Sequence, residues 1–190
     1  MQYLLSNVGS CPEENNVNRT LSSFSLERKR VAGDGDCLFT SIAIHTLLQM
    51  NTHPGSTISN HLYNIGFNGL HSTTSTALLL RQLVSDEFVN NPDVYMTYFP
   101  HNTDDDIENY FEMASEFRQA GIYNSDIGDA ALLAISNVIS TPVIVFSTVP
   151  YHTIIPVLPS RPAIHPAPFV HIIYNHASEH YDASCPYSQY

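Results

Sequence analysis

Cys37 follows a short turn of glycines and acids, Gly33-Asp34-Gly35-Asp36, and an apolar helical pattern begins directly behind it. This spacing predicts that Cys37 lies in the first turn of a helix, where free backbone N–H groups and the helix dipole favour an anion. A thiolate there is a nucleophile, and the same N–H groups can bind a developing oxyanion. The alternative is an inert buried cysteine at a helix end, but such a residue needs no Gly-Asp-Gly turn before it.

A cysteine nucleophile needs a base, usually histidine, and the chain has 10 histidines. His45 lies about two helical turns beyond Cys37 and cannot reach its sulphur. His176 and His180 lie in the turn after the last predicted strand, and the others lie in polar loops or within that strand. His180 is followed by Asp182, and along an extended segment these two side chains lie on the same side. The carboxylate can therefore accept the ring N–H, which makes His180 the predicted base.

These residues carry a resemblance to a known family. The stretch Asp34-Gly35-Asp36-Cys37-Leu38-Phe39 resembles the catalytic loop of the ovarian-tumour (OTU) family of deubiquitinating cysteine proteases, which is typically D-G-N-C-L-F. The ending His180-Tyr181-Asp182-Ala183-Ser184 resembles that family's H-Y-D-S, after the apolar strand Ile172-Ile173-Tyr174. Between them, Leu80 to Val84 and Asn91 to Tyr95 resemble its middle helix and following segment. The similarity covers about residues 30 to 185.

The resemblance implies a set of roles. Cys37 attacks the isopeptide carbonyl, His180 takes the thiol proton, and Asp182 orients His180. Asp34 and the backbone N–H groups around Gly35 and Asp36 shape the oxyanion pocket. The implied substrate is ubiquitin or a polyubiquitin chain, and the family uses no organic cofactor and no metal.

Three departures from the family pattern stand out. Asp36 replaces the usual Asn, and its charge is expected to raise the pKa of the neighbouring thiol. Thr40 stands where a basic residue is common, and Tyr123-Asn124-Ser125 replaces Trp-Gly-Gly before a later helix. None of these changes removes a catalytic group, so we expect an active enzyme.

Two other functional classes stay open on the sequence alone. One is a different cysteine-dependent enzyme: a protease for another ubiquitin-like modifier or for ordinary peptides, or an acyltransferase. The papain-type C-G-S-C-W signature is absent, although the order of cysteine before histidine is shared. The other class is a non-enzymatic ubiquitin-binding module on an inactivated fold, against which the intact Cys37, His180 and Asp182 argue.

The predicted elements that position these residues are helices in the first part of the chain and strands in the last part. Apolar periodicity predicts helices over residues 37–50, 76–89, 103–121 and 125–138, and strands over 143–146, 153–158 and 169–174. This order predicts an α+β, OTU-like fold with helical layers on a small β-sheet and the nucleophile at the N-terminus of a buried helix. Residues 1–23 are predicted to be a loosely ordered lead-in, and residues 24–190 a single catalytic domain.

Composition restricts partners and compartment. The 190 residues are 43% hydrophobic, which suits one domain with a real core, and the net charge of −11 argues against nucleic acid and favours a basic protein partner. No apolar run is long enough for a membrane span, and the start does not read as a signal peptide. Three widely spaced cysteines suggest a reduced, intracellular and cytoplasmic setting. We expect a monomer, and the basic run Arg28-Lys29-Arg30 reads as solvated surface.

Overall fold

The computed structural model describes residues 12–69, 72–98, 106–123, 125–164 and 170–187. Helices and strands both contribute, and the fold class is α+β, as the sequence predicts. The α-helices are α1 (Pro12–Ser23), α2 (Cys37–Thr52), α3 (Thr57–Leu62), α4 (Thr73–Asn90), α5 (Pro92–Tyr95), α6 (Asp106–Glu116) and α7 (Ser125–Ile139). Short π- and 3-10 turns are η1 (Tyr63–Phe67), η2 (Met96–Tyr98) and η3 (His176–Ser178). The strands are β1 (Leu26–Lys29), β2 (Val143–Ser147), β3 (Ile154–Val157), β4 (Val170–Asn175) and β5 (His180–Pro186).

The strands form one five-stranded sheet in the order β1-β5-β4-β2-β3. Strands β2 and β4 run parallel, while β1–β5, β4–β5 and β2–β3 are antiparallel pairs. The weak strand predicted around Pro156 lies at an edge, where a missing N–H leaves no ladder bond unmade. The last strand along the chain, β5, lies inside the sheet between β1 and β4.

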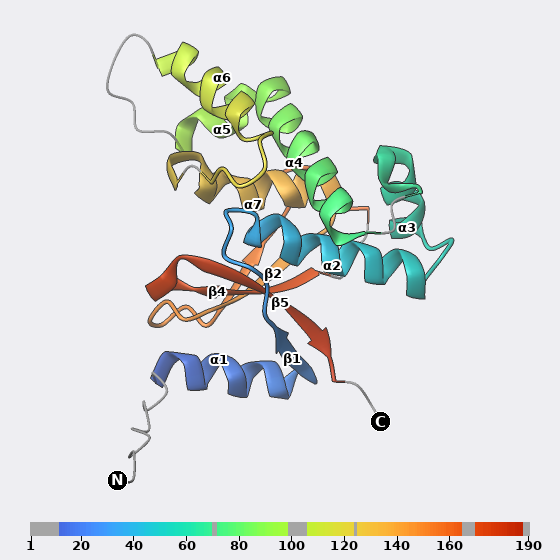
Figure 1. Ribbon diagram of the computed structural model, residues 1–190, viewed down its shortest axis with the longest axis vertical. Coiled ribbons are helices and arrows are strands. Elements are labelled where there is room, and N and C mark those ends of the chain that lie inside the picture. The colour runs from blue at the N-terminus through green and yellow to red at the C-terminus, as the bar shows by residue number, and fades with distance from the viewer. Residues whose placement is uncertain (1–11, 70–71, 99–105, 124, 165–169, 188–190) are drawn as a thin grey trace, which may run out of the picture.

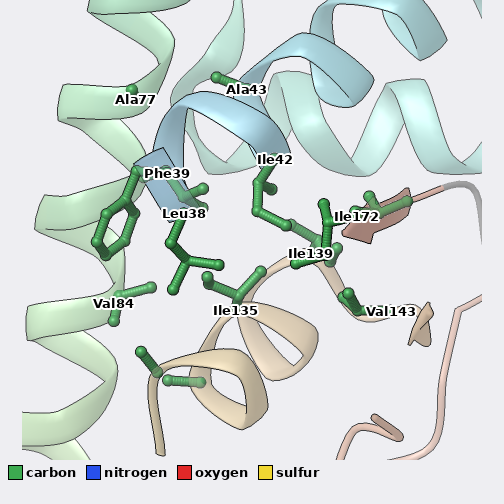
Figure 2. Packing of buried hydrophobic residues seen from close by; sticks show 14 of the residues in the cluster. Leu38, Phe39, Ile42, Ala43, Ala77, Val84, Ile135, Ile139, Val143 and Ile172 are labelled. Atoms are coloured by element: carbon green, nitrogen blue, oxygen red, sulfur yellow. The ribbon is translucent and has the colours of Figure 1, made fainter. Parts of the chain in front are cut away.

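Helix α2 runs through the main core between the sheet and helices α4 and α7 (Figure 1). Leu38, Phe39 and Ile42 have no exposed surface. They point toward Ile135 and Ile139 of α7 and toward side chains of α4, β2 and β4 (Figure 2). A helix that is apolar on most sides is stable only when it is surrounded, and this burial fixes the position of its first residue, Cys37.

The N-terminal segment differs from the sequence prediction. Residues 12–23 form helix α1 rather than a loose lead-in, and α1 covers the opposite face of the sheet from α2 (Figure 1). Alternate strand residues point to opposite faces, so Phe146 and Ile173 lie on the α1 side. They join three side chains in a second, smaller core: Val17, Leu21 and Leu26. The helix is missed because its apolar stripe is short and is stabilised by strands far along the chain.

Helices α2, α4 and α7 confirm the predicted helices, and β2 and β4 confirm two predicted strands. Strands β1 and β5 are additional. The predicted start of α6 at Thr103 lies outside the described residues, and so does Cys11. Within the described part of the chain, none of the helices has the length and apolar character needed to cross a membrane.

Candidate active site

Cys37 is the first residue of α2, and Asp36 occupies the N-cap position. The carbonyl of Asp36 accepts the first intrahelical bond, from the Thr40 N–H at 2.8 Å. The Asp36 side chain makes no capping bond to the helix, because it is used elsewhere. Only 9% of Cys37 is exposed, so this residue is part of the buried core.

Burial raises the pKa of the Cys37 thiol. Backbone hydrogen bonding from Tyr181 and Leu38 lowers that pKa, and the charge of Asp34 raises it, but removal from water dominates. Burial therefore opposes the stabilisation of the thiolate that is predicted from the helix end. A thiol of this kind needs a base to take its proton during attack.

His180 and Asp182 form the contact between ring and carboxylate that the sequence predicts. The ring Nε2 of His180 lies 3.1 Å from Oδ1 of Asp182, and the same oxygen accepts the backbone N–H of Val31 at 3.0 Å. Both residues lie on β5, where the strand alternation places their side chains on one side. The backbone of Tyr181, which lies between them, interacts with the Cys37 thiol, so this end of β5 lies beside the start of α2.

With Nε2 held by Asp182, Nδ1 is the ring nitrogen left for proton transfer. A Cβ built on Gly33 would lie 3.6 Å from this Nδ1, so the turn before Cys37 runs directly beside the histidine ring. A Cβ at position 33 would meet the ring at ordinary van der Waals distance. This contact joins the two motifs, which are far apart in the sequence.

The turn itself needs glycine at position 35. Gly35 has φ +84°, and a Cβ there would lie 2.1 Å from the carbonyl oxygen of Gly121. Asp34 Oδ1 accepts the N–H of Asp36 at 3.0 Å, which closes the turn. The turn before Cys37 therefore packs closely against the segment that follows α6.

A buried arginine forms hydrogen bonds to both the turn before Cys37 and the segment after α6. Arg81 of α4 has no exposed surface, and its Nη2 donates to the carbonyl of Gly35 at 2.7 Å. Its Nη1 donates to the carbonyls of Phe117 and Ile122, and its Nε pairs with the Asp36 carboxylate. The guanidinium carbon also lies 4.4 Å from the centre of the Phe39 ring, a cation–π contact.

Two solved structures share this architecture. The OTU domain of OTUD1 matches with a TM-score of 0.57 and 15% identity, over 91% of this chain and 94% of that chain. The structure described as h/ceOTUB1-ubiquitin aldehyde-UBCH5B~Ub matches with a TM-score of 0.60 and 14% identity, over 94% of this chain and 85% of that chain. The chain has the OTU fold. No protein-family model and no curated protein matches its sequence, so the likeness is one of backbone architecture.

Within this OTU fold, Asp36 does not act as the sequence predicts. Its carboxylate is paired with Arg81 and also accepts the Gly121 N–H at 3.1 Å. The acid whose charge raises the pKa of Cys37 is Asp34. The reason is that a buried guanidinium compensates the extra negative charge at position 36.

Sequence reasoning missed both arginines near this OTU site. Arg81 falls within the buried stripe of α4, with Leu80 and Val84 beside it, and a charge inside an apolar stripe is a signal of a paired buried group. The sequence predicts Arg28 to be solvated surface, and the structure shows otherwise. Its side chain is 14% exposed and forms ion pairs with Glu14 and Asp182.

Proposed function

We propose that this chain is a cysteine-dependent deubiquitinase that hydrolyses the isopeptide bond after the C-terminal glycine of ubiquitin. The observation that carries the proposal is the contact of His180 with Asp182 on β5, beside a thiol at the start of a buried helix. An inert cysteine at a helix end requires neither a histidine next to its turn nor a carboxylate that fixes the ring.

In the proposed reaction, Nδ1 of His180 takes the Cys37 proton as the sulphur attacks the isopeptide carbonyl carbon. The tetrahedral oxyanion is stabilised by backbone N–H groups of the turn. His180 then gives the proton to the leaving lysine amine, and the C–N bond breaks to leave a thioester. Water, deprotonated by His180, hydrolyses the thioester and frees Cys37. Asp182 holds the ring in the productive tautomer throughout.

The Asp36 N–H is one candidate oxyanion donor, and in the free protein it is bonded to Asp34. It can serve the oxyanion only by exchanging that partner. The N–H of Cys37 is the second candidate donor. Asp34 therefore acts, in this proposal, as the group that holds the donor in place until substrate arrives.

Two observations support ubiquitin as the substrate. The neighbouring OTUB1 structure contains ubiquitin aldehyde, according to its description. The chain carries a formal net charge of −11, which suits attraction of a basic protein surface and speeds encounter with it.

The test uses a panel of covalent probes in which ubiquitin and several ubiquitin-like modifiers end in a thiol-reactive group, together with differently linked diubiquitins. The expected result is labelling by the ubiquitin probe and cleavage of diubiquitin, both lost in Cys37→Ala. Cys185→Ser is the matched control, because Cys185 is a free cysteine on β5, the strand of His180, and has no glycine turn before it. Labelling only by another modifier would change the substrate, and ubiquitin binding without cleavage or labelling would exclude the enzymatic proposal.

A further inference from the structure

Arg28 lies between an acid of helix α1 and the acid of the active site. Its Nη1 pairs with Glu14, and its Nε lies 3.8 Å from Oδ2 of Asp182. Glu14 also receives a long contact, 3.5 Å, from the side-chain amide of Asn175. Asn175 pairs with His180 in the sheet. Glu14 is therefore linked to Asp182 through Arg28 and to His180 through Asn175.

Two nitrogens of the Arg28 guanidinium donate no hydrogen bond to the described residues. Its Nε and Nη2 are buried and have no hydrogen-bond partner among the described residues. Oδ1 of Asp182 contacts the His180 ring and accepts the Val31 N–H, while Oδ2 faces Arg28. The positive charge therefore sits beside the carboxylate without a close hydrogen bond, and it acts on Asp182 through charge.

Other ionisable groups lie nearby. The charge of Asp34 acts on the Cys37 thiol, and Tyr174 packs its ring against Tyr181, whose side chain points to the opposite face of the sheet from Asp182. His176 and Glu179 precede His180 in the connecting turn. Among the described residues, Arg28 is the one cation that forms an ion pair with Asp182 apart from the catalytic ring.

We propose that Arg28 is a positioning residue for His180: it weakens the hold of Asp182 on the protonated ring, and Glu14 limits this effect by sharing the Arg28 charge. The inference rests on the proposed function for its catalytic meaning. It makes helix α1, which covers the opposite face of the sheet from the nucleophile helix, part of the catalytic apparatus.

The proposal gives opposite signs for two neighbouring substitutions. Arg28→Gln removes the competing cation, so Asp182 stabilises the imidazolium more and His180 loses its proton at higher pH. Glu14→Gln frees the Arg28 charge to act on Asp182, so His180 loses its proton at lower pH. A purely structural role for either residue predicts no such opposition.

The experiment follows the His180 ring by NMR from pH 5 to 10 in a Cys37→Ala background, with the signal assigned by its loss in His180→Gln. Shifts of about half a pH unit are expected, upward for Arg28→Gln and downward for Glu14→Gln. The Glu14→Gln shift should shrink when Arg28 is also replaced. Arg30→Gln, an exposed change in the same basic run, should leave the titration in place.

Arg28→Lys keeps the charge and serves if Arg28→Gln does not fold. The His180 ring in this variant should titrate close to that of the parent protein. Shifts of both variants in one direction, or no shift in either folded variant, would overturn the proposal. Because the readout is a proton on a ring and not turnover, these outcomes are separate from failure of the deubiquitinase proposal, which the covalent probes decide.

Discussion

Arg81 donates to the carbonyl oxygen of Gly35 over 2.7 Å from a side chain with no exposed surface. The carbonyl of residue 35 and the N–H of residue 36 belong to one planar peptide unit and point in opposite directions. By holding that carbonyl inward, Arg81 turns the Asp36 N–H away from the core, where it meets Asp34. A side chain on α4 thereby sets the orientation of a candidate oxyanion donor.

The first prediction concerns the partner of this arginine. Asp36→Ala leaves the buried Arg81 charge unpaired, and it should lower the free energy of unfolding by about 3 kcal/mol or more and reduce kcat/KM. Asp36→Asn keeps an oxygen for Arg81 and the Gly121 N–H, and it should retain most activity. Urea unfolding and ubiquitin hydrolysis check both variants. Equal behaviour of Ala and Asn would mean that the pairing does not stabilise the turn.

A second prediction isolates the close approach at Gly35. Gly35→Ala places a Cβ 2.1 Å from the Gly121 carbonyl oxygen, so the turn must move and kcat/KM should fall by about 100-fold. Gly55→Ala is the matched control, because Gly55 has a similar φ of +81° and nothing within 4 Å. The control should cost about 1 kcal/mol of stability and little activity. Comparable losses of activity in the two variants would point to backbone strain alone.

The choice of base gives a third prediction. His180→Ala should reduce kcat/KM by several orders of magnitude, because it removes the group that exchanges protons with the thiol and the leaving amine. His176→Ala should remain active, since His176 lies on η3 and its ring packs near Tyr174 rather than Asp182. Steady-state assays on both variants decide between them; a severe loss confined to His176→Ala would move the base.

Asp34 and Asp182 should differ in which proton they affect. The Asp34 charge raises the pKa of the Cys37 thiol, so Asp34→Asn should shift alkylation of Cys37 by iodoacetamide to lower pH. Asp182→Asn replaces the charged acceptor of the His180 ring N–H by a neutral amide that no longer fixes the tautomer or stabilises the imidazolium, and it should cost more in kcat/KM, up to about 10⁴-fold as in serine triads. Alkylation and turnover measured against pH test the assignment. If only Asp182→Asn moves the alkylation curve, the two roles must be exchanged.

Alkaline stability provides a prediction independent of activity. Burial raises the pKa values of Cys37, Tyr95 and Tyr110. Above the pH at which these groups ionise in the unfolded chain, about 8.5 for Cys and about 10 for Tyr, unfolding releases protons that the folded state keeps. The free energy of unfolding should therefore fall as pH rises beyond those values.

Tyr110→Phe tests this decline. The variant loses the hydrogen bond from Tyr110 to the Phe88 carbonyl, at a cost of about 1 kcal/mol near neutral pH, but its stability should fall less steeply above pH 10. Tyr151→Phe, at a fully exposed position, is the control. Urea midpoints between pH 7 and pH 11 measure both, and parallel curves for Tyr110→Phe and the parent protein would contradict the prediction.

Periodicity and spacing in the sequence predicted the features that depend on neighbouring residues. Helices α2, α4 and α7 have long apolar stripes, and the spacing of His180 and Asp182 alone predicts that they share one side of an extended segment. The hydrogen bonds and ion pair of the buried Arg81 and the helix α1 could not be predicted in this way. Arg81 meets acceptors from residues 35, 36, 117 and 122, and α1 packs on Phe146 and Ile173, more than a hundred residues away, as well as on the neighbouring β1. Such contacts are set by tertiary packing, for which a single sequence carries no periodic signal.

The position of β5 has a consequence for how the protein folds. This strand is the last along the chain, yet it pairs with β1 and β4 inside the sheet and carries both His180 and Asp182. Joining β1 to β5 closes a loop of most of the chain, and such long-range pairing is the slow part of folding. A chain that has formed α2 but not this pairing has Cys37 in place without the proposed base, His180. Recovery of activity after dilution from denaturant should therefore follow the slowest ordering event, later than the return of helical signal.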